Sequence, residues 1–194
     1  MRWFFPLLLF CGTLQAQVQD VCRITLNHQN LQIVDYEKVK CLAMNSQKSK
    51  TIVYTFGIWC QPCIYHLPQA LALEQEYDVD VYVLIVDPEN TQFITRALVF
   101  FKEFDAKYQQ KTKLLLLEDV EGKKSRSKKY KSFLAQITPS HFENINDMSK
   151  YIVLNKKGET VLVTNYKDSK QDVDWTDDRP MLKRLVIPLL QERK

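Results

Sequence analysis

The sequence predicts an α/β fold with a central mixed β-sheet flanked by helices. From residue 51 onward, apolar β-prone runs alternate with segments of helical periodicity, which is the element order of α/β layers. Segment 79–87 is nearly continuously apolar in its C-terminal half, as in a central strand covered on both faces. Segments 151–154 and 161–164 flank a glycine-bearing loop and therefore predict an antiparallel hairpin in the same sheet.

In the first part of the chain, up to about residue 77, the clearest predicted elements are a strand over 51–56 and the helix that follows it. In order, we expect a short strand over 21–26, a helix over 35–45, a polar turn over 45–50 and a strand over 51–56. A helix follows Cys60 and extends to about Tyr77. Pro68 lies inside this helix and should kink it, because proline lacks a backbone N–H.

The rest of the chain continues the alternation. The expected elements are a strand over 79–87 that Pro88 ends, a helix over 91–109, a strand over 114–117, a helix over 127–136, strands over 151–154 and 161–164, and a closing helix over 180–191. Pro188 should limit the regularity of the closing helix.

The first 16 residues have the pattern of a secretory signal peptide. Arg2 gives a charged start, residues 3–11 are apolar, and cleavage is expected after Ala16. The apolar run is about half of the ~20 residues that a membrane span needs. We therefore expect export to the periplasm or cell envelope. The alternatives are an uncleaved anchor and a lipoprotein acylated at Cys11.

These features divide the chain into a signal peptide (1–16), an N-terminal extension (17–50) and a main domain (51–194). After cleavage, four cysteines remain: Cys22, Cys41, Cys60 and Cys63. Oxidising compartments permit stable disulfides. Cys22 and Cys41 are a candidate structural bridge, and the alternative is two free thiols, because sequence does not fix connectivity.

Cys60 and Cys63 form a C-x-x-C pair where a strand meets a helix. A thiol at a helix N-terminus faces unpaired N–H groups and the positive end of the helix dipole, which favour the reactive thiolate. We expect Cys60, nearer the helix start, to be the exposed attacking thiolate and Cys63 to resolve the mixed disulfide. Pro62 removes one backbone donor and stiffens the first turn.

This element order and motif resemble the thioredoxin fold, and more narrowly the exported TlpA/ResA-type thiol–disulfide oxidoreductases. Segment 56–63 (FGIWCQPC) matches the strand-end aromatic, tryptophan and Cys-x-Pro-Cys pattern of that family. Pro68 matches its helix-kinking proline, and 114–136 sits where the family carries a strand–helix insertion. The resemblance covers about residues 51–165 and makes 51–194 a thioredoxin-like domain.

The resemblance implies a thiol–disulfide oxidoreductase that acts on exported proteins, as a reductant. An oxidising or isomerising role stays open. The implied partners are disulfide-containing or dithiol exported proteins and a membrane electron donor. No cofactor is expected, because the chain has only 4 glycines and no glycine-rich phosphate loop. Trp59 is expected to shield the cysteine pair and offer a flat contact, and its alternative role is core packing.

The sequence departs from the family pattern at three places. Tyr54 stands where thioredoxins have a buried acid, and His66 stands where the family has a glutamate. His66 shares a helix face with Cys63, so its imidazole is a candidate to take or return the Cys63 proton, and the alternative is a histidine with no such role. Pro139 is the best match to the family's cis-proline and should shape the groove beside the disulfide. The alternative places this position near Ser149, without a proline.

Two other function classes remain. Cys60, Cys63 and His66 form C-x-x-C-x-x-H, whose thiolates suit Cu(I) or Zn, so one alternative is an envelope metal carrier. The other is a non-catalytic thioredoxin-fold scaffold, which the two intact cysteines disfavour. The net charge of +4 is too small to argue for nucleic acid as a partner. We interpret the basic run over 123–131 as the solvated face of a helix and its loop rather than a surface for an acidic partner.

Overall fold

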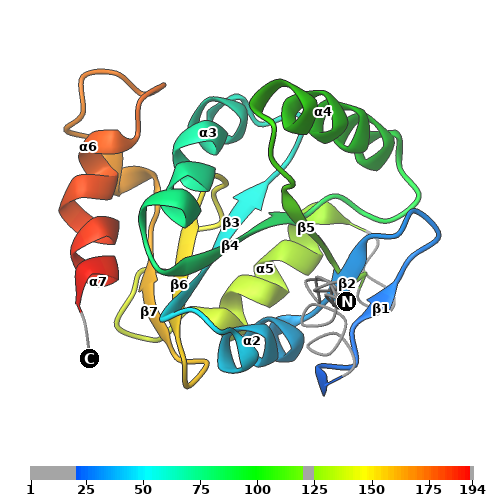
Figure 1. Cartoon of the computed structure of the whole chain (residues 1–194), viewed down its shortest axis with the longest axis horizontal. Coiled ribbons are helices and arrows are strands. Elements are labelled where there is room, and N and C mark those ends of the chain that lie inside the picture. The colour runs from blue at the N-terminus through cyan, green and yellow to red at the C-terminus, as the bar shows by residue number, and fades with distance from the viewer. Residues whose placement is uncertain (1–20, 120–124, 193–194) are drawn as a thin grey trace, which may run out of the picture.

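The computed structural model describes residues 21–119 and 125–192, so the predicted signal peptide (1–16) lies outside the described residues. Seven strands form one mixed sheet in the order β1-β2-β5-β4-β3-β6-β7 (Figure 1). The strands are β1 (Thr25–Leu26), β2 (Gln32–Val34), β3 (Lys50–Phe56), β4 (Val79–Ile85), β5 (Lys113–Leu117), β6 (Tyr151–Asn155) and β7 (Thr160–Val163). The pairs β2–β5, β5–β4 and β4–β3 are parallel, whereas β1–β2, β3–β6 and β6–β7 are antiparallel.

Helices cover both faces of this sheet. They are α2 (Tyr36–Asn45), α3 (Gln61–Glu76), α4 (Gln92–Tyr108), α5 (Arg126–Ile137), α6 (Arg179–Met181) and α7 (Ile187–Gln191). A 3₁₀ turn (Tyr166–Ser169) follows β7, and a π-helical segment (Leu182–Val186) joins α6 to α7. Figure 1 shows α3 and α4 on one face of the sheet and α2 and α5 on the other.

The central strand β3 is buried on both sides because its side chains alternate between two apolar cores. Ile52, Tyr54 and Phe56 pack with apolar residues of α3 and α4. Val53 points the other way and packs with apolar residues of α2 and α5. Packing on both faces therefore holds the C-terminal end of β3 in place, and the cysteine pair follows directly after that end.

The predicted elements are confirmed with small shifts in their bounds, apart from three differences. The strand expected over 21–26 is limited to Thr25–Leu26, and the three-residue strand β2 was not predicted. β5 enters the sheet between β2 and β4, so the segment matched to the family insertion adds a strand inside the sheet. The closing helix is irregular as expected, because Pro188 has no N–H and the Ile187 N–H bonds to Leu182 in a π-type turn.

A disulfide joins Cys22 to Cys41, with a Cα–Cα distance of 5.6 Å. It attaches the segment before β1 to the last turns of α2, where the Asn45 side chain also donates to the Cys41 carbonyl at 2.9 Å. The disulfide therefore closes the N-terminal extension on itself. The pairing of β2 with β5 attaches that extension to the main domain. Within residues 21–119 and 125–192, no helix has the length and apolar character that crossing a membrane requires.

Candidate active site around Cys60 and Cys63

The cysteine pair stands in a tight connection between β3 and α3. The Cys60 N–H donates to the Gly57 carbonyl at 2.9 Å, which turns the chain directly after the strand. A Cβ atom on Gly57 would lie 2.7 Å from the Trp59 indole nitrogen, so only glycine lets that indole fold back over the turn. Cys60 is the N-cap of α3, and Pro62 lies in its first turn.

Cys60 and Cys63 are joined in a disulfide across this first turn, with a Cα–Cα distance of 5.2 Å. The Cys60 sulfur also accepts the Cys63 N–H at 3.2 Å. Cys60 is 7% exposed and Cys63 is fully buried, so of the two residues only Cys60 can be reached from the surface. These positions agree with the roles expected of an attacking and a resolving cysteine.

Trp59 leads from the disulfide to a polar cluster at the end of β4. Its indole is 41% exposed, and its Nε1 donates to the buried Asp87 carboxylate at 3.1 Å. Arg126, the first residue of α5, pairs with the same Asp87 oxygen at 2.5 Å and lies over the Trp59 ring. Lys129 is fully buried nearby and donates to the Asp87 carbonyl at 2.8 Å. Trp59 is therefore held in place while one of its faces stays accessible.

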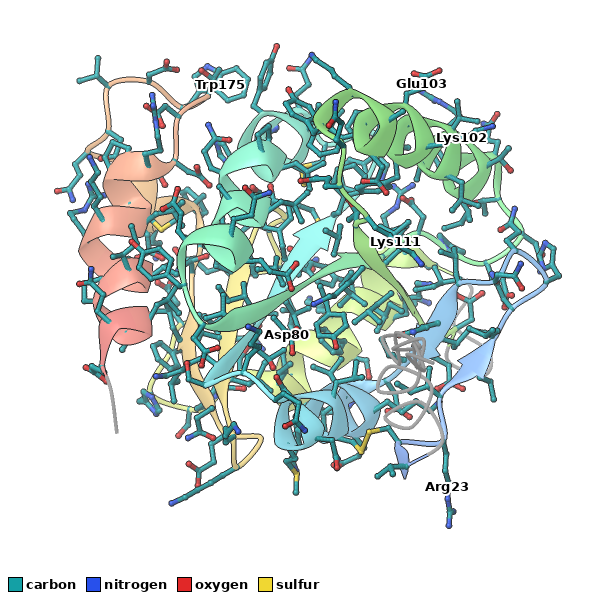
Figure 2. The ribbon with its side chains drawn as sticks, viewed as in Figure 1. Arg23, Asp80, Lys102, Glu103, Lys111 and Trp175 are labelled. Atoms are coloured by element: carbon teal, nitrogen blue, oxygen red, sulfur yellow. A yellow bond between two sulfur atoms is a disulfide. The ribbon has the colours of Figure 1, made fainter. Side chains whose placement is uncertain are left out.

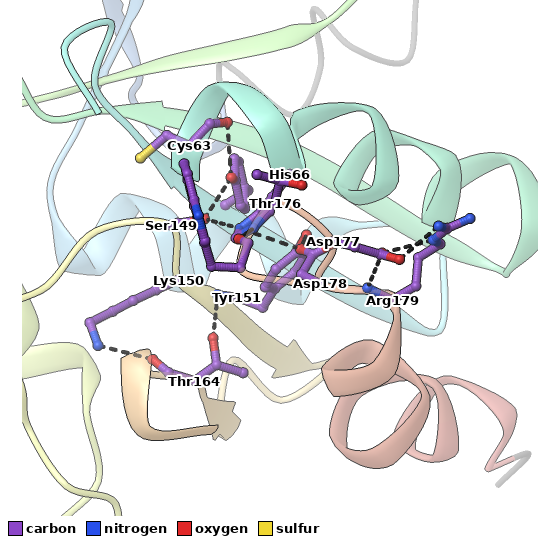
Figure 3. Close-up of polar contacts among 12 residues, drawn as sticks. Cys63, His66, Ser149, Lys150, Tyr151, Thr164, Thr176, Asp177, Asp178 and Arg179 are labelled. Atoms are coloured by element: carbon purple, nitrogen blue, oxygen red, sulfur yellow. Dashed lines mark hydrogen bonds and ion pairs between the residues drawn. The ribbon is translucent and has the colours of Figure 1, made fainter. Parts of the chain in front are cut away.

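A second polar chain runs beneath Cys63 toward β6 (Figure 3). The buried Tyr54 hydroxyl donates to the Cys63 carbonyl at 3.0 Å and lies 2.8 Å from the Ser149 hydroxyl. Ser149 Oγ is 2.9 Å from His66 Nδ1. His66 Nε2 is 2.8 Å from the Trp175 carbonyl, so the chain continues into the loop before α6.

The hydrogen-bond roles along this chain determine where protons can sit. A carbonyl only accepts, so His66 Nε2 carries a proton to donate to Trp175. Tyr54 gives its only hydroxyl proton to Cys63, so Ser149 donates to Tyr54 and His66 Nδ1 donates to Ser149. All four hydrogen bonds are made at once when His66 holds protons on both nitrogens. The Asp178 carboxylate can balance the charge of a doubly protonated His66 ring, because Asp178 Oδ2 lies 3.8 Å from His66 Nδ1.

Asp178 is a buried carboxyl at this site that sequence reasoning missed. It is 1% exposed, Tyr151 donates a hydrogen bond to its Oδ2, and its Oδ1 has no hydrogen-bond partner among the described residues. Burial raises the pKa of Asp178, and the nearby His66 ring and the Tyr151 hydroxyl oppose that rise. Burial likewise raises the pKa of Tyr54 well above its usual value, so Tyr54 remains a neutral donor.

The raised pKa of Asp178 predicts the pH dependence of an Asp178→Asn variant. The folded state protonates this carboxyl more readily than the unfolded state, so its contribution to stability is lost as pH rises through the folded pKa. Relative to the wild type, the variant should therefore gain stability as pH rises from about 4. Urea denaturation at several pH values measures this difference.

The neighbouring Asp177 supplies a control of opposite sign. Its hydrogen bond with Arg179 lowers the pKa of Asp177 to about 2, so its contribution is present above the unfolded value and is lost as pH falls. An Asp177→Asn variant should therefore lose stability relative to the wild type as pH rises from about 2. Parallel curves for the wild type and Asp178→Asn would contradict the raised pKa.

The prediction for Pro139 is wrong in position. The described residues contain no cis peptide bond, and Pro139 lies in the turn after α5, where its carbonyl accepts from Phe142. Ser149, two residues before β6, is the residue of this loop that lies beside the cysteine pair, at the alternative position that the sequence left open. Ser149 adopts φ +65°, in the left-handed region, and this turns its hydroxyl toward Tyr54 and His66. The chain therefore places a hydrogen-bonding side chain where the family has a proline.

The interpretation of the basic run over 123–131 also needs correction. Lys128 and Lys131 are exposed, as a solvated face requires. Lys129 is fully buried and Arg126 packs on Trp59, so these two belong to the site instead. Residues 123 and 124 lie outside the described residues. The only sequence signal for the role of Arg126 and Lys129 was the position of the run, two helices and two strands after the cysteine pair.

The proposed metal ligands do not form a cluster in this structure. Within residues 21–119 and 125–192, no group of three or more His, Cys, Asp and Glu side chains is arranged to hold a metal ion. Both ring nitrogens of His66 are engaged by Ser149 and Trp175. No observation among the described residues therefore favours the metal-carrier alternative.

Comparison with known proteins assigns the fold. Protein-family models gave no match, and curated proteins gave none either. Among solved structures, a thiol-disulfide isomerase from Corynebacterium glutamicum is 22% identical over 75% of this chain and 83% of its own, with a TM-score of 0.50. A thioredoxin-like protein in its oxidized form is 15% identical over 76% of this chain and 81% of its own, with a TM-score of 0.49. The chain has a thioredoxin-like fold.

Proposed function

We propose that this chain is a thiol–disulfide oxidoreductase of the cell envelope that reduces disulfides in exported proteins. The observation that carries the proposal is the Cys60–Cys63 disulfide at the start of α3, in which Cys60 is 7% exposed and Cys63 is fully buried. The α/β fold places this pair where thioredoxin-like proteins carry their redox site. The N-terminal half of α3 stabilises a thiolate on Cys60 through its dipole and the Cys63 N–H.

The reaction is a pair of thiol–disulfide exchanges. In the reduced protein, the Cys60 thiolate attacks a substrate disulfide, forms a mixed disulfide and releases one substrate thiolate. The Cys63 thiol then loses its proton and attacks Cys60 Sγ. This step forms the Cys60–Cys63 disulfide and releases the second substrate thiol. Two electrons pass to the substrate, and a membrane dithiol donor of the same chemistry returns them to the protein.

Two features support an envelope location. The first 16 residues have the composition of a cleaved signal peptide. The Cys22–Cys41 disulfide is typical of an oxidising compartment, because cytosolic reductants keep cysteine pairs reduced. The role as a reductant rests on the resemblance of segment 56–63 to TlpA/ResA-type proteins.

A Cys63→Ala variant tests the proposal by trapping its intermediate. Without the resolving thiol, the variant should accumulate mixed disulfides on Cys60 with proteins of the envelope fraction, and these should disappear on reduction. A Cys60→Ala, Cys63→Ala variant is the matched control and should form none. Absence of adducts on Cys63→Ala would overturn exchange with proteins, and adducts confined to the cytosol would overturn the envelope location.

The reduction potential of the Cys60–Cys63 couple tests the direction of electron flow. Potentials of proteins that carry such a pair extend from about −270 mV for thioredoxin to about −120 mV for strong oxidants. As a reductant, the Cys60–Cys63 couple should lie near the thioredoxin end when it is equilibrated with glutathione or dithiothreitol buffers. A value near −120 mV would make the protein an oxidant instead.

His66 is proposed to handle protons for the buried cysteine. A hydrogen-bonded chain through Ser149 and Tyr54 joins its ring to the Cys63 carbonyl, so this chain positions the ring beside the cysteine pair and does not itself carry the thiol proton. Histidine exchanges protons closer to neutral pH than other side chains. A His66→Ala variant should therefore show a changed pH profile of the exchange rate between pH 5 and 8. Ser49→Ala, far from the pair at the start of β3, is the control. Identical pH profiles for wild type and His66→Ala would remove the role.

A further inference from the structure

A cleft opens beside the cysteine pair on the side of β4. Its volume is about 540 Å³, which is room for several residues of an extended chain rather than one side chain. The residues around it include Trp59, Phe93, Arg126, Asn146 and Met148. Because Trp59 directly precedes Cys60, a polypeptide whose cysteine reacts at Cys60 would place its neighbouring residues in this cleft.

Among the described residues that line this cleft, Arg126 is the charged one, and its side chain is held rigidly. Arg126 Nε donates to Asp87 Oδ1 at 2.5 Å, and Nη2 forms an ion pair with the same oxygen, also at 2.5 Å. Its guanidinium carbon lies 4.4 Å from the centre of the Trp59 ring and 4.8 Å from that of Phe93. A guanidinium carries five N–H groups, so donors remain for a ligand after the contact with Asp87. The side chain is 30% exposed, so these donors are within reach from the cleft.

The surroundings of Arg126 favour a negative ligand. Arg126 begins the 12-residue helix α5, and Ser125 and Ser127 beside it line the same cleft, so the positive end of the helix dipole lies there. Asp87 is shared between Arg126 and the Trp59 indole, and it also lies beside the buried Lys129.

On the other side of the cysteine pair, the loop before α6 carries negative charge. There the loop before α6 packs on α3 through an edge-to-face contact between Tyr65 and Trp175, with ring centres 5.4 Å apart. Figure 2 shows Trp175 at the tip of that loop, beside the start of α3. The same loop carries Asp174 and Asp177, whose lowered pKa values keep both carboxyls ionised. A substrate carboxylate is therefore repelled on the α6 side and attracted on the Arg126 side.

We propose that the cleft binds the substrate segment next to the reactive cysteine and that Arg126 selects segments carrying a carboxylate side chain. The inference rests on the proposed oxidoreductase function and names the class of polypeptide on which it acts. Arg126 pairs with the carboxylate through its remaining N–H groups, while Trp59 and Phe93 fix the guanidinium and contact the substrate backbone. Because the guanidinium is already held, little side-chain freedom is lost on binding.

A series of disulfide peptides tests this selection on the unmodified protein. The peptides are identical except for Glu, Gln or Lys at each of the two positions on either side of the reactive cysteine. At one position, kcat/KM should be about tenfold higher for the Glu peptide than for the Lys peptide, and the ratio should shrink in high salt. Equal rates for the three peptides at every position, or a preference for Lys, would overturn the inference.

Two variants locate the effect. Arg126→Gln should lose the Glu-to-Lys preference, whereas Lys131→Gln removes an equal charge from an exposed position of the same helix and should keep it. Each variant is judged by its own ratio of rates, so a change in overall activity does not affect the result. A preference that survives in Arg126→Gln would overturn the assignment to this residue.

The uncharged substrate 2-hydroxyethyl disulfide separates the two hypotheses. Turnover of this disulfide without any charge preference among the peptides would overturn the inference and leave the proposed function standing. Failure to reduce either 2-hydroxyethyl disulfide or any peptide would overturn the proposed function, and the inference with it.

Discussion

Replacing Lys129 with methionine should lower the free energy of unfolding by about 3 kcal/mol. The Lys129 ammonium is fully buried and donates to the carbonyls of Asp87 and Leu117, both at 2.8 Å, and to the Asp119 carboxylate at 2.7 Å. Burial lowers the pKa of Lys129, and the hydrogen bond and charge of Asp119 oppose this shift. Methionine would fill the space of the aliphatic stem but would leave two carbonyls without their donor.

The same substitution should disturb the redox site, because Lys129 joins the ends of β4 and β5 where Asp87 begins its contacts with Trp59 and Arg126. Lys128→Met is the matched control, since Lys128 is the exposed neighbour on α5, and it should change stability by less than about 0.5 kcal/mol. Urea denaturation of the oxidised proteins measures both. If Lys129→Met lowers the free energy of unfolding by less than about 1 kcal/mol, the three hydrogen bonds of Lys129 do not contribute to stability as expected.

Removing the Cys22–Cys41 disulfide should also destabilise the fold by about 3 kcal/mol. The bond closes a loop with a sequence separation of 19, and its loss frees the unfolded chain over that length. A Cys22→Ser, Cys41→Ser variant makes the change without leaving a lone thiol. Denaturant titration should show a lower midpoint with a slope at least as steep, because the unfolded chain without the cross-link exposes at least as much surface.

The double variant should keep its exchange activity. Cys41 lies on α2, which leads to the N-terminal end of β3, whereas Cys60 follows the C-terminal end of that strand. Loss of activity in a folded double variant would mean that the N-terminal bridge takes part in electron transfer. A reduced slope of the titration would instead indicate that β1 and the segment before it separate from the sheet.

The sequence was sufficient for those parts of the molecule that local pattern determines. β3, β4 and the start of α3 are long or strongly patterned, and their apolar residues are the ones buried in both cores. The cysteine roles followed from position at a helix start, and the different exposure of Cys60 and Cys63 agrees with them. The strand β2 was not predicted, because three residues are too few to show a periodicity. Its pairing with β5 is what makes it a strand.

The missed site residues share one property: their partners are distant in the sequence. Asp178 lies 112 residues after His66, and nothing local distinguishes it from an ordinary helix-capping aspartate. Ser149, 83 residues after His66, was named only as an alternative position for the loop, and its hydrogen bonds were not predicted. Lys129 and Arg126 sit in a run of basic residues, which is a pattern typical of solvated surface. Their burial depends on Asp87, which ends a strand about 40 residues earlier.

The two edges of the sheet bear on how such a protein handles unfolded client chains. β1 at one edge has two residues, and β7 at the other has four and a register shift in its pairing with β6 (Figure 1). Short and irregular edges offer few unpaired backbone groups in a row, so they make a poor template for β-addition or aggregation. Under the proposed function, a client whose disulfide is attacked by Cys60 would therefore be held by the mixed disulfide and released when Cys63 resolves it, rather than retained as an extra strand.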